Sequence, residues 1–392
     1  MSIIAIPQEL LELRTSILDF IEREIRPVEA KYAQELQETG TIANAEEEKR
    51  AIRKRSAELG FYTLHMSEDV GGAGLSYLGQ CLMQEAIAAS GSFLAGRGGV
   101  MASVEGPTPV LHACTPEQRE RWLDPLMRAE REMCFALTEP GAGSDATRIK
   151  TKAERKGDSY VINGTKHFIT HGEEADFALV FAVTDAEKRS RGGITAFLVD
   201  KDAPGFTVAR RQHTASTVDR PAELVFNDVE VTGENVLGQE GYGFAAAMSW
   251  INGGRLSIAS QAVGYAQLLT DKMLDYAKSR VAFGSTIGSY QYVQGMIVDS
   301  LNELEQARLF TYKKADEIDG GADGRREAAQ AKVVATEMVG RVADRAIQVY
   351  GGNGFMTEMG IERYWREVRA MRLYEGTSEI LRSNIAKTLG LG

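Results

Sequence analysis

The chain has 392 residues, a formal net charge of −10 and 43% hydrophobic residues, which is typical of a folded globular protein with room for two or three domains. The acidic balance disfavours a nucleic-acid partner, because binding to a phosphate backbone needs clustered positive charge. Neither a targeting peptide nor an apolar run of membrane-spanning length is present, so we expect a cytoplasmic protein, or a mature matrix form without its transit peptide, that has no membrane partner.

The cysteines and histidines do not have the spacing of a metal site. Cys81, Cys114 and Cys134 are odd in number and form no C-x-x-C pair, which argues against a disulfide framework or a zinc site and favours a reducing compartment. The five histidines lack a ligand pattern. We therefore predict no metal. Motifs of serine hydrolases, zinc proteases and P-loop nucleotidases are also absent from the sequence.

The first third of the chain has helical periodicity. Apolar residues such as Leu10, Ile17 and Ile21 recur at helical spacing, with breaks at glycines near 40, 71–74 and 91. Thr115 before Pro116 is typical of a helix N-cap followed by proline in the first turn. Residues 1–130 are therefore predicted to form an N-terminal helical domain.

Short β-type runs separated by turn residues begin near Met133. The middle region, residues 131–240, is predicted to be rich in strands at 160–162, 166–170, 177–183, 194–199, 206–209 and 223–226. Its clearest turn signal is Asn163-Gly164, which predicts a tight hairpin because both residue types accept positive φ.

Helical periodicity returns in the last part of the chain. Residues 241–392 are predicted to form a C-terminal helical domain with helices near 241–280, 290–318, 325–350, 358–372 and 378–389. The predicted fold class is α+β and mainly helical.

Two glycine-rich segments are candidate ligand sites. A predicted strand beginning near Phe135 runs into a turn in which Gly141, Gly143 and Ala146 superficially match a dinucleotide fingerprint. The absence of a βαβ series disfavours that interpretation, which leaves a ligand-binding turn or a plain turn. The glycines at 351, 352 and 354 permit close approach of a ligand or a second chain, or simply end a helix.

The segment 374–379, YEGTSE, contains the candidate catalytic residue. Glu375 lies in a predicted loop beside Gly376, just before a helix capped by Thr377 or Ser378. An apolar pocket around such a carboxylate would raise its pKa toward the value that a general base needs. The local alternative is an ordinary exposed loop glutamate.

Taken together, these segments resemble the acyl-CoA dehydrogenase family over essentially the whole chain. The resemblance rests on 138–145 (TEPGAGSD), 163–170 (NGTKHFIT), 253–264 (GGRLSIASQAVG), Arg280 with Phe283-Gly284, 348–355 (QVYGGNGF) and 374–379. It implies an N-terminal helical domain, a middle β-barrel-like domain and a C-terminal four-helix bundle. It further implies FAD as cofactor and a homotetramer, a dimer of dimers, in which two subunits share each FAD site.

The resemblance also implies roles for individual residues. Those expected to bind FAD are Phe135, Thr138, Ser144, Phe168, Ile169, Thr170, Arg280, Phe283, Gln291, Gln348, Gly351, Gly352, Thr377 and Glu379. Those expected to contact the acyl-CoA are Ser144, Asn252, Arg255, Tyr374, Gly376 and Glu105. Of the FAD set, Arg280, Gln291 and residues 348–352 would come from the neighbouring subunit.

The implied reaction is α,β-dehydrogenation of an acyl-CoA to the trans-2-enoyl-CoA. Glu375 matches the base that removes the α-proton as hydride leaves the β-carbon for the flavin, and an electron-transfer flavoprotein would then accept the electrons. The apolar run before Glu105 is compatible with a short to medium acyl chain, whereas Arg97 offers the alternative of a carboxylate-bearing acyl group.

The sequence departs from the family pattern in two places. Phe168 stands where the family often has tryptophan beside the flavin, and the segment 210–221 differs from the usual glycine-containing loop. The alternatives are a relative with a different outcome, such as an acyl-CoA oxidase, an enoyl-CoA reductase or an acyl-CoA desulfinase, or a non-catalytic flavoprotein. A retained Glu375 disfavours relatives that abstract no α-proton.

Overall fold

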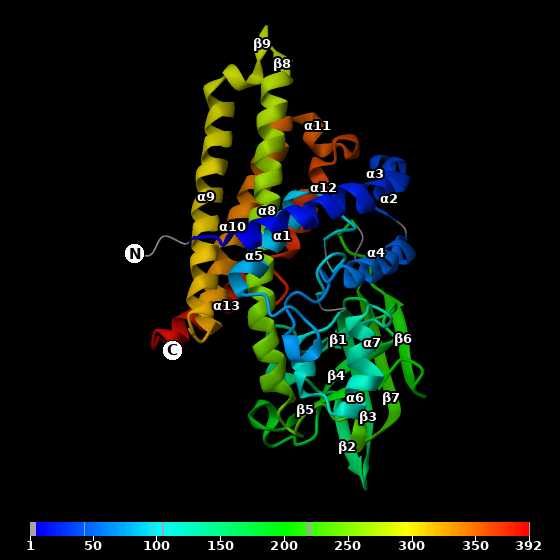
Figure 1. Ribbon diagram of the computed structural model, residues 1–392. Helices are drawn as coiled ribbons and strands as arrows, with labels where there is room; N and C mark the ends of the chain where they lie inside the picture. The colour runs from blue at the N-terminus through cyan, green and yellow to red at the C-terminus, as the bar shows by residue number, and fades with distance from the viewer. Residues whose placement is uncertain (1–4, 43, 97, 104–105, 218–220, 392) are drawn as a thin grey trace.

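The computed structural model describes residues 5–42, 44–96, 98–103, 106–217 and 221–391. Helices, a curved sheet and a bundle of long helices follow one another along the chain (Figure 1). None of the described helices combines the length and apolar character that crossing a membrane requires. Arg97 and Glu105, which the resemblance connects with the acyl group, lie outside the described residues.

The N-terminal region is helical, as predicted. Leu10, Ile17 and Ile21 are buried, so the apolar stripe of the first helix faces the core. Thr115 caps α6 in a complete capping box with Gln118. The helices here are α1 (Gln8–Phe20), α2 (Arg26–Glu29), α3 (Ala33–Thr39), α4 (Glu46–Glu58), α5 (Tyr77–Ala89), α6 (Pro116–Gln118) and α7 (Asp124–Met127).

The middle region is a seven-stranded sheet with the order β1-β4-β2-β3-β7-β6, in which β5 also pairs with β4. β1 is parallel to β4, whereas most other pairs are antiparallel. Among the described residues this topology contains no βαβ series, which agrees with the sequence-based argument against a dinucleotide-binding fold. The strands are β1 (Met133–Ala136), β2 (Lys152–Lys156), β3 (Ser159–Ile169), β4 (Phe177–Val183), β5 (Ile194–Asp200), β6 (Phe206–Arg211) and β7 (Ala222–Thr232).

The predicted hairpin at Asn163-Gly164 is wrong, because β3 continues through both residues. Its pairing with β7 shifts register there, which is the mark of a bulge. The Asn163 side chain donates to Asp228 Oδ1 at 2.9 Å, across the strand pair. A Cβ on Gly164 would lie 2.3 Å from Thr151 Oγ1. The glycine is therefore needed for the close approach of Thr151 to the strand and not for a turn.

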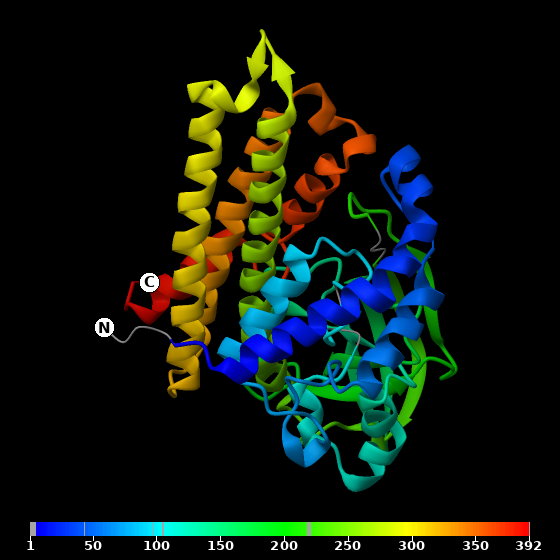
Figure 2. The same ribbon diagram turned by 45° about the horizontal axis from the view of Figure 1, so that its top comes forward.

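The C-terminal region contains three long helices that run side by side (Figure 2). α10 packs on α8 and α9 and also on the shorter α12 and α13. A small hairpin between α8 and α9 forms the tip of the bundle farthest from the sheet (Figure 1). The elements are α8 (Gly243–Ser279), β8 (Val281–Ala282), β9 (Ser285–Thr286), α9 (Gln291–Asp319), α10 (Arg325–Tyr350), α11 (Gly352–Phe355), α12 (Ile361–Ala370) and α13 (Ser378–Thr388).

Helix α8 connects the sheet to the bundle. Near its start, Ala247 belongs to a core that includes Phe177 of the sheet and Trp122 of the N-terminal region. Farther along, Leu256 and Met273 belong to the core of the helical regions. Burial in both cores holds α8 rigidly, so side chains on one of its faces have defined positions.

Candidate active site

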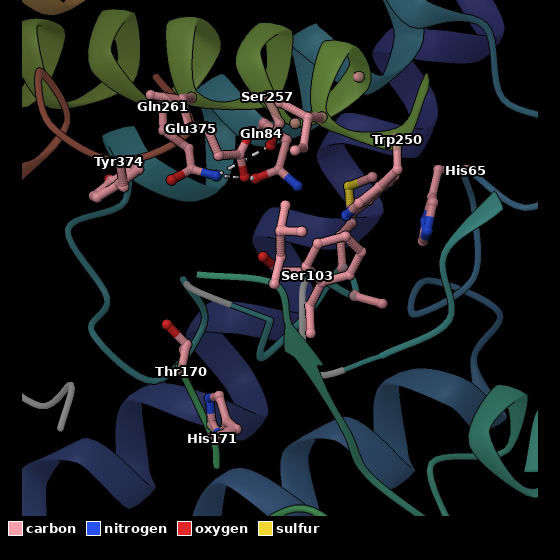
Figure 3. Close-up of a pocket in the computed structure, with 18 of the residues that line it drawn as sticks. His65, Gln84, Ser103, Thr170, His171, Trp250, Ser257, Gln261, Tyr374 and Glu375 are labelled. Carbon is pink, nitrogen blue, oxygen red and sulfur yellow. Dashed lines mark hydrogen bonds between the residues drawn. The ribbon is translucent and has the colours of Figure 1, made fainter. Parts of the chain in front are cut away.

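A cavity of about 310 Å³ lies between the sheet, α5, α8 and the loop from α12 to α13 (Figure 3). The ends of β1 and β3 form one wall, while α8 and the loop form another. The lining side chains that matter below are Phe135, Thr138, Phe168, Ile169, Thr170, Tyr374, Glu375, Gln84, Ser257 and Gln261. The cavity thus unites residues from all three regions of the chain.

Glu375 lines this cavity and has an unusual environment. Its φ is 52°, in the left-handed region that non-glycine residues rarely adopt. Its Oε2 atom is buried and has no hydrogen-bond partner among the described residues. Burial raises the pKa of the Glu375 carboxyl to about 7, although the positive charges of Arg255 and Lys332 act to lower it. A carboxylate with this pKa is suited to accept a proton near neutral pH.

The approach of Glu375 to α8 depends on Gly254. A Cβ at Gly254 would lie 2.2 Å from Glu375 Oε2 and 2.8 Å from its Cδ. Glycine therefore lets the carboxylate lie against the helix, which is what withdraws it from water.

The predicted acyl-CoA contacts Asn252, Arg255 and Gly376 surround the Glu375 loop, outside the cavity lining. Arg255 Nε donates to the carbonyl of Glu375 at 3.0 Å, and its Nη1 donates to Asn252 Oδ1 at 2.8 Å. Gly376 has a φ of 96°. Thr377 caps α13 by accepting from the Ile380 N–H at 3.3 Å, which confirms the predicted helix start.

The sheet wall presents hydroxyl groups and aromatic rings. The N–H of His167 donates to the carbonyl of Thr138 at 2.8 Å, which ties the end of β3 to the segment after β1. Phe168 has a φ of 57° and is 61% exposed. Its N–H donates to Gln212 Oε1 at 3.0 Å, so the atypical 210–221 segment supports the cavity wall at Phe168.

Other residues predicted to bind FAD or acyl-CoA lie away from this cavity. Ser144 is exposed in the segment after β1. Arg280, Phe283 and Gln291 lie at the β8–β9 tip, and Phe283 is 98% exposed. The remaining predicted residues lie at the end of α10 and at the start of α13: Gln348, Gly351, Gly352, Thr377 and Glu379.

The cavity also contains a polar cluster that the sequence analysis did not predict. Gln261 Nε2 donates to Gln84 Oε1 and to Ser257 Oγ, each at 3.1 Å (Figure 3). Gly254, Ser257 and Gln261 recur at helical spacing, so the face could have been found once Gly254 was placed beside Glu375. The contribution of Gln84 from α5 has no sequence signal.

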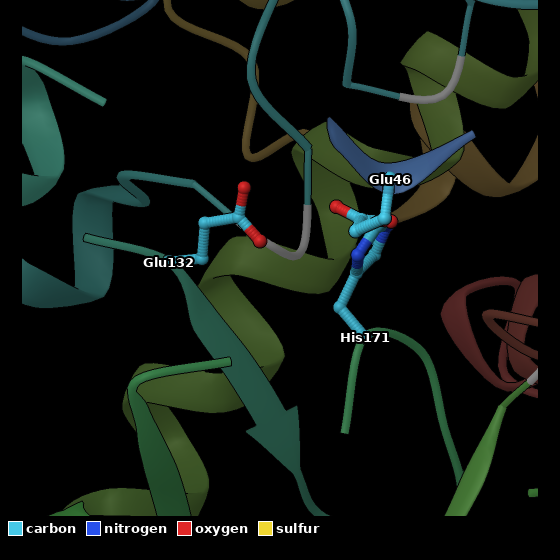
Figure 4. Close-up of side chains that lie close together, drawn as sticks. All are labelled: Glu46, Glu132 and His171. Atoms are coloured by element: carbon cyan, nitrogen blue, oxygen red, sulfur yellow. The ribbon is translucent and has the colours of Figure 1, made fainter. Parts of the chain in front are cut away.

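A second group of titratable side chains lies beneath the sheet wall. Oxygen and nitrogen atoms of Glu46, Glu132 and His171 lie within 4.8 Å of one another (Figure 4). The guanidinium of Arg53 bonds to Glu46 at 3.0 Å and also contacts Glu132. This buried arginine supplies positive charge to the cluster, so these residues act as an ion-pair network that joins α4 to the sheet.

The comparison with known families decides the identity of the fold. Successive stretches of the chain match the N-terminal domain of acyl-CoA dehydrogenases at residues 7–130, the middle domain at 134–229 and the C-terminal domain at 241–390. The chain belongs to the acyl-CoA dehydrogenase family. It is accordingly an oxidoreductase that acts on CH–CH groups, with FAD as its cofactor.

Individual members of the acyl-CoA dehydrogenase family match nearly end to end. The mitochondrial short-chain specific acyl-CoA dehydrogenase of Mus musculus is 37% identical over 98% of this chain and 90% of its own. The caffeyl-CoA reductase-Etf complex subunit CarC of Acetobacterium woodii is 34% identical over 94% of each chain. Among solved structures, an FAD complex of PigA has a TM-score of 0.89 and 26% identity, and the match covers all of both chains.

The cavity fits the flavin that the acyl-CoA dehydrogenase family uses. Thr138 and Thr170 offer hydroxyl groups that can donate to or accept from a heteroaromatic ring. The rings of Phe135 and Phe168 offer apolar faces beside them. This combination of apolar walls and a few hydroxyl groups is typical of a cofactor site.

Proposed function

We propose that the protein catalyses α,β-dehydrogenation of a short-chain acyl-CoA to the trans-2-enoyl-CoA, with Glu375 as the base that removes the α-proton. The observation that carries the proposal is the Glu375 carboxylate itself, which faces the cavity with a buried, unpartnered Oε2. The pKa of this carboxyl, raised to about 7 by burial, suits removal of a weakly acidic proton.

The cofactor would occupy the sheet side of the cavity. Thr138 and Thr170 would bond to the edge of the flavin ring, and Phe168 would pack beside it. Bound FAD supplies the acceptor for the hydride that leaves the β-carbon. The acyl thioester would lie between that ring and Glu375, where the N–H of Glu375 would donate to the thioester carbonyl and stabilise the charge left by the departing proton.

A short acyl chain is favoured by the polar cluster of Gln84, Ser257 and Gln261. The amide N–H groups of Gln84 and the carbonyl of Gln261 are not used within the cluster. A long hydrocarbon chain in contact with these groups would remove their water without replacing it, at a cost of about 1–3 kcal/mol for each buried group. The short-chain specific relative supports the same chain length.

The remaining assignments concern groups outside the cavity. We propose that Ser144, Asn252, Arg255, Tyr374 and Gly376 contact the CoA thioester. Residues at the β8–β9 tip and at the end of α10 would bind the adenosine and pyrophosphate part of FAD in a neighbouring subunit of a homotetramer. Thr377 and Glu379, at the start of α13, would complete the FAD site. The Etf-complex relative supports an electron-transfer flavoprotein as the redox partner.

Anaerobic reduction by a panel of saturated thioesters tests the reaction and chain length together. We expect butyryl-CoA to bleach the flavin absorbance faster than octanoyl- or palmitoyl-CoA does. The Glu375→Gln variant should retain FAD and bind the same thioesters, but reduce its flavin at least about 100-fold more slowly, since it lacks the base. Reduction of Glu375→Gln at the wild-type rate would refute the role of Glu375, and a flavin that no thioester reduces would refute dehydrogenation.

The reverse direction is a second candidate, because one close relative is named a reductase. The same groups would then protonate the α-carbon of an enoyl-CoA. Chemically reduced enzyme would be mixed with an aliphatic and an aryl-substituted enoyl-CoA. Fast reoxidation by the enoyl-CoA, together with no bleaching by the saturated thioester, would favour the reductase.

A further inference from the structure

Two cations hold consecutive carbonyl groups of the loop that carries Glu375. Arg255, from α8, donates to the carbonyl of Glu375 at 3.0 Å. Lys332, from α10, donates to the carbonyl of Gly376 at 2.9 Å. Both loop residues have positive φ, 52° and 96°. For Glu375, a non-glycine residue, this conformation is strained, so the loop needs outside contacts to retain it.

The burial of Lys332 requires an explanation. The residue is 0% exposed, and lysine is rarely buried without a charged partner. Within the part of the chain that the structure describes, the Lys332 ammonium donates to a neutral carbonyl, which does not balance its charge. If Lys332 only filled space, an apolar side chain of similar length could replace it without loss of stability.

The charges around Lys332 come from four elements. Glu375 of the loop acts on it most strongly among these charges, followed by Arg255 of α8, Glu337 of α10 and Glu379 of α13. Glu337 already pairs with Arg372 at 3.3 Å and Arg382 at 3.6 Å, and Glu379 is exposed. Glu375 is therefore the acidic group that interacts most strongly with Lys332, and Arg255 is the second cation that acts on the same carboxylate.

We propose that Lys332 is a positioning residue for Glu375. Its ammonium group holds the Gly376 carbonyl, and so the turn that presents the carboxylate to the cavity, while its positive charge favours the ionised form of that carboxylate. The benefit to proton abstraction rests on the proposed function, whereas the effect on Glu375 ionisation does not.

Three variants at position 332 separate the hydrogen bond from the charge. Lys332→Met removes both, Lys332→Gln keeps a donor without the charge, and Lys332→Arg keeps the charge. Thr336→Val is the matched control. Thr336 is 0% exposed one turn farther along α10, and its hydroxyl donates to the Lys332 carbonyl at 2.7 Å, so the change disturbs the backbone at Lys332 without altering charge.

Ionisation of Glu375 is measured in the FAD-loaded protein without turnover. Carbonyl-stretch infrared titration, with the Glu375→Gln spectrum subtracted, gives the midpoint of this one carboxyl. We expect the midpoint to rise by about one pH unit in Lys332→Met and Lys332→Gln, because an opposite charge nearby is lost, and to stay near the wild-type value in Lys332→Arg and Thr336→Val.

The pH profile of flavin reduction is the second readout. In the Met and Gln variants, the acidic limb of this profile should shift to higher pH by the same interval as the infrared midpoint. At a pH below that midpoint, flavin reduction should therefore be about tenfold slower than in the wild type. An unchanged infrared midpoint in Lys332→Gln would overturn the inference, and so would a midpoint that rises in Thr336→Val as much as in Lys332→Gln. If Lys332→Met fails to fold, the Gln variant decides. If no thioester reduces the wild-type flavin, the proposed function fails while the infrared midpoints still decide the role of Lys332.

Discussion

At the scale of single residues, the proposed chemistry depends on the environment of one carboxylate. Glu375 is a loop glutamate next to a glycine, and nothing in its immediate neighbours buries it. Gly254 on α8 lets it lie against the helix, while Arg255 and Lys332 hold the carbonyls of its turn. Burial without a hydrogen bond disfavours the ionised form, which raises the pKa and makes Glu375 a usable base.

The same burial makes stability depend on pH. The pKa of the Glu375 carboxyl is raised from 4.5 to about 7 on folding, so the folded protein keeps a proton that the unfolded chain releases between these values. Wild-type stability should therefore fall, relative to Glu375→Gln, as pH rises from about 5 to 7, by about 2 kcal/mol. Urea unfolding of both FAD-loaded proteins across this range measures the difference, and a constant difference would contradict the raised pKa.

At the scale of elements, α8 organises the cavity. Gly254, Ser257 and Gln261 lie on one face of the helix, because three- and four-residue steps return to the same side. Gln84 reaches this face from α5, which packs against α8. The helix pair therefore places a polar cluster where the acyl chain would extend from Glu375.

Replacing this cluster should change the preferred chain length. In the double variant Gln84→Leu with Gln261→Leu, hydrocarbon no longer meets the Gln84 N–H groups and the Gln261 carbonyl, so kcat/KM for octanoyl-CoA should rise about tenfold relative to butyryl-CoA. The single variants are harder to interpret, because each removes the hydrogen-bond partner of the remaining amide. Gln34→Leu, on the exposed surface of α3, is the control. An unchanged octanoyl-to-butyryl ratio in the double variant would show that the cluster does not limit chain length.

At the scale of the whole molecule, most of the predicted FAD residues fall into two separated sets, whereas Ser144, Thr377 and Glu379 belong to neither. One set lines the cavity, and the other lies at the β8–β9 tip and the end of α10. The tip also exposes large apolar side chains, with Phe283 98% and Tyr292 93% exposed. Large exposed apolar side chains are expected at a contact surface, and they are consistent with the proposed assembly in which each tip completes a neighbour's cavity.

Complementation between two inactive variants tests this assembly. Glu375→Gln loses the base of its own cavity, and Arg280→Ala would lose a FAD contact in its neighbour's cavity. A mixed dimer then contains one intact site, so co-expression of equal amounts should restore about a quarter of wild-type activity. If both residues serve the same subunit's site, co-assembled variants will stay inactive.

Much of the fold could be predicted from the sequence, because local patterns reflect local forces. The long C-terminal helices begin and end within a few residues of their predicted bounds, and the caps at Thr115 and Thr377 are confirmed. The Asn163-Gly164 hairpin was wrong because the turn preference of two residues lost to strand pairing with β7 and to the close approach of Thr151.

The sequence by itself determined the order of helices and strands, the helix caps and the identity of the candidate base. Only the tertiary structure decided that Glu375 is withdrawn from water, that Lys332 lies beneath its turn, and that Gln84 and Gln261 face the same cavity. The physical reason is that ionisation and acyl-chain preference depend on groups brought together from distant segments. A periodic pattern reports which face of a helix is buried, but not which side chain of another helix meets it.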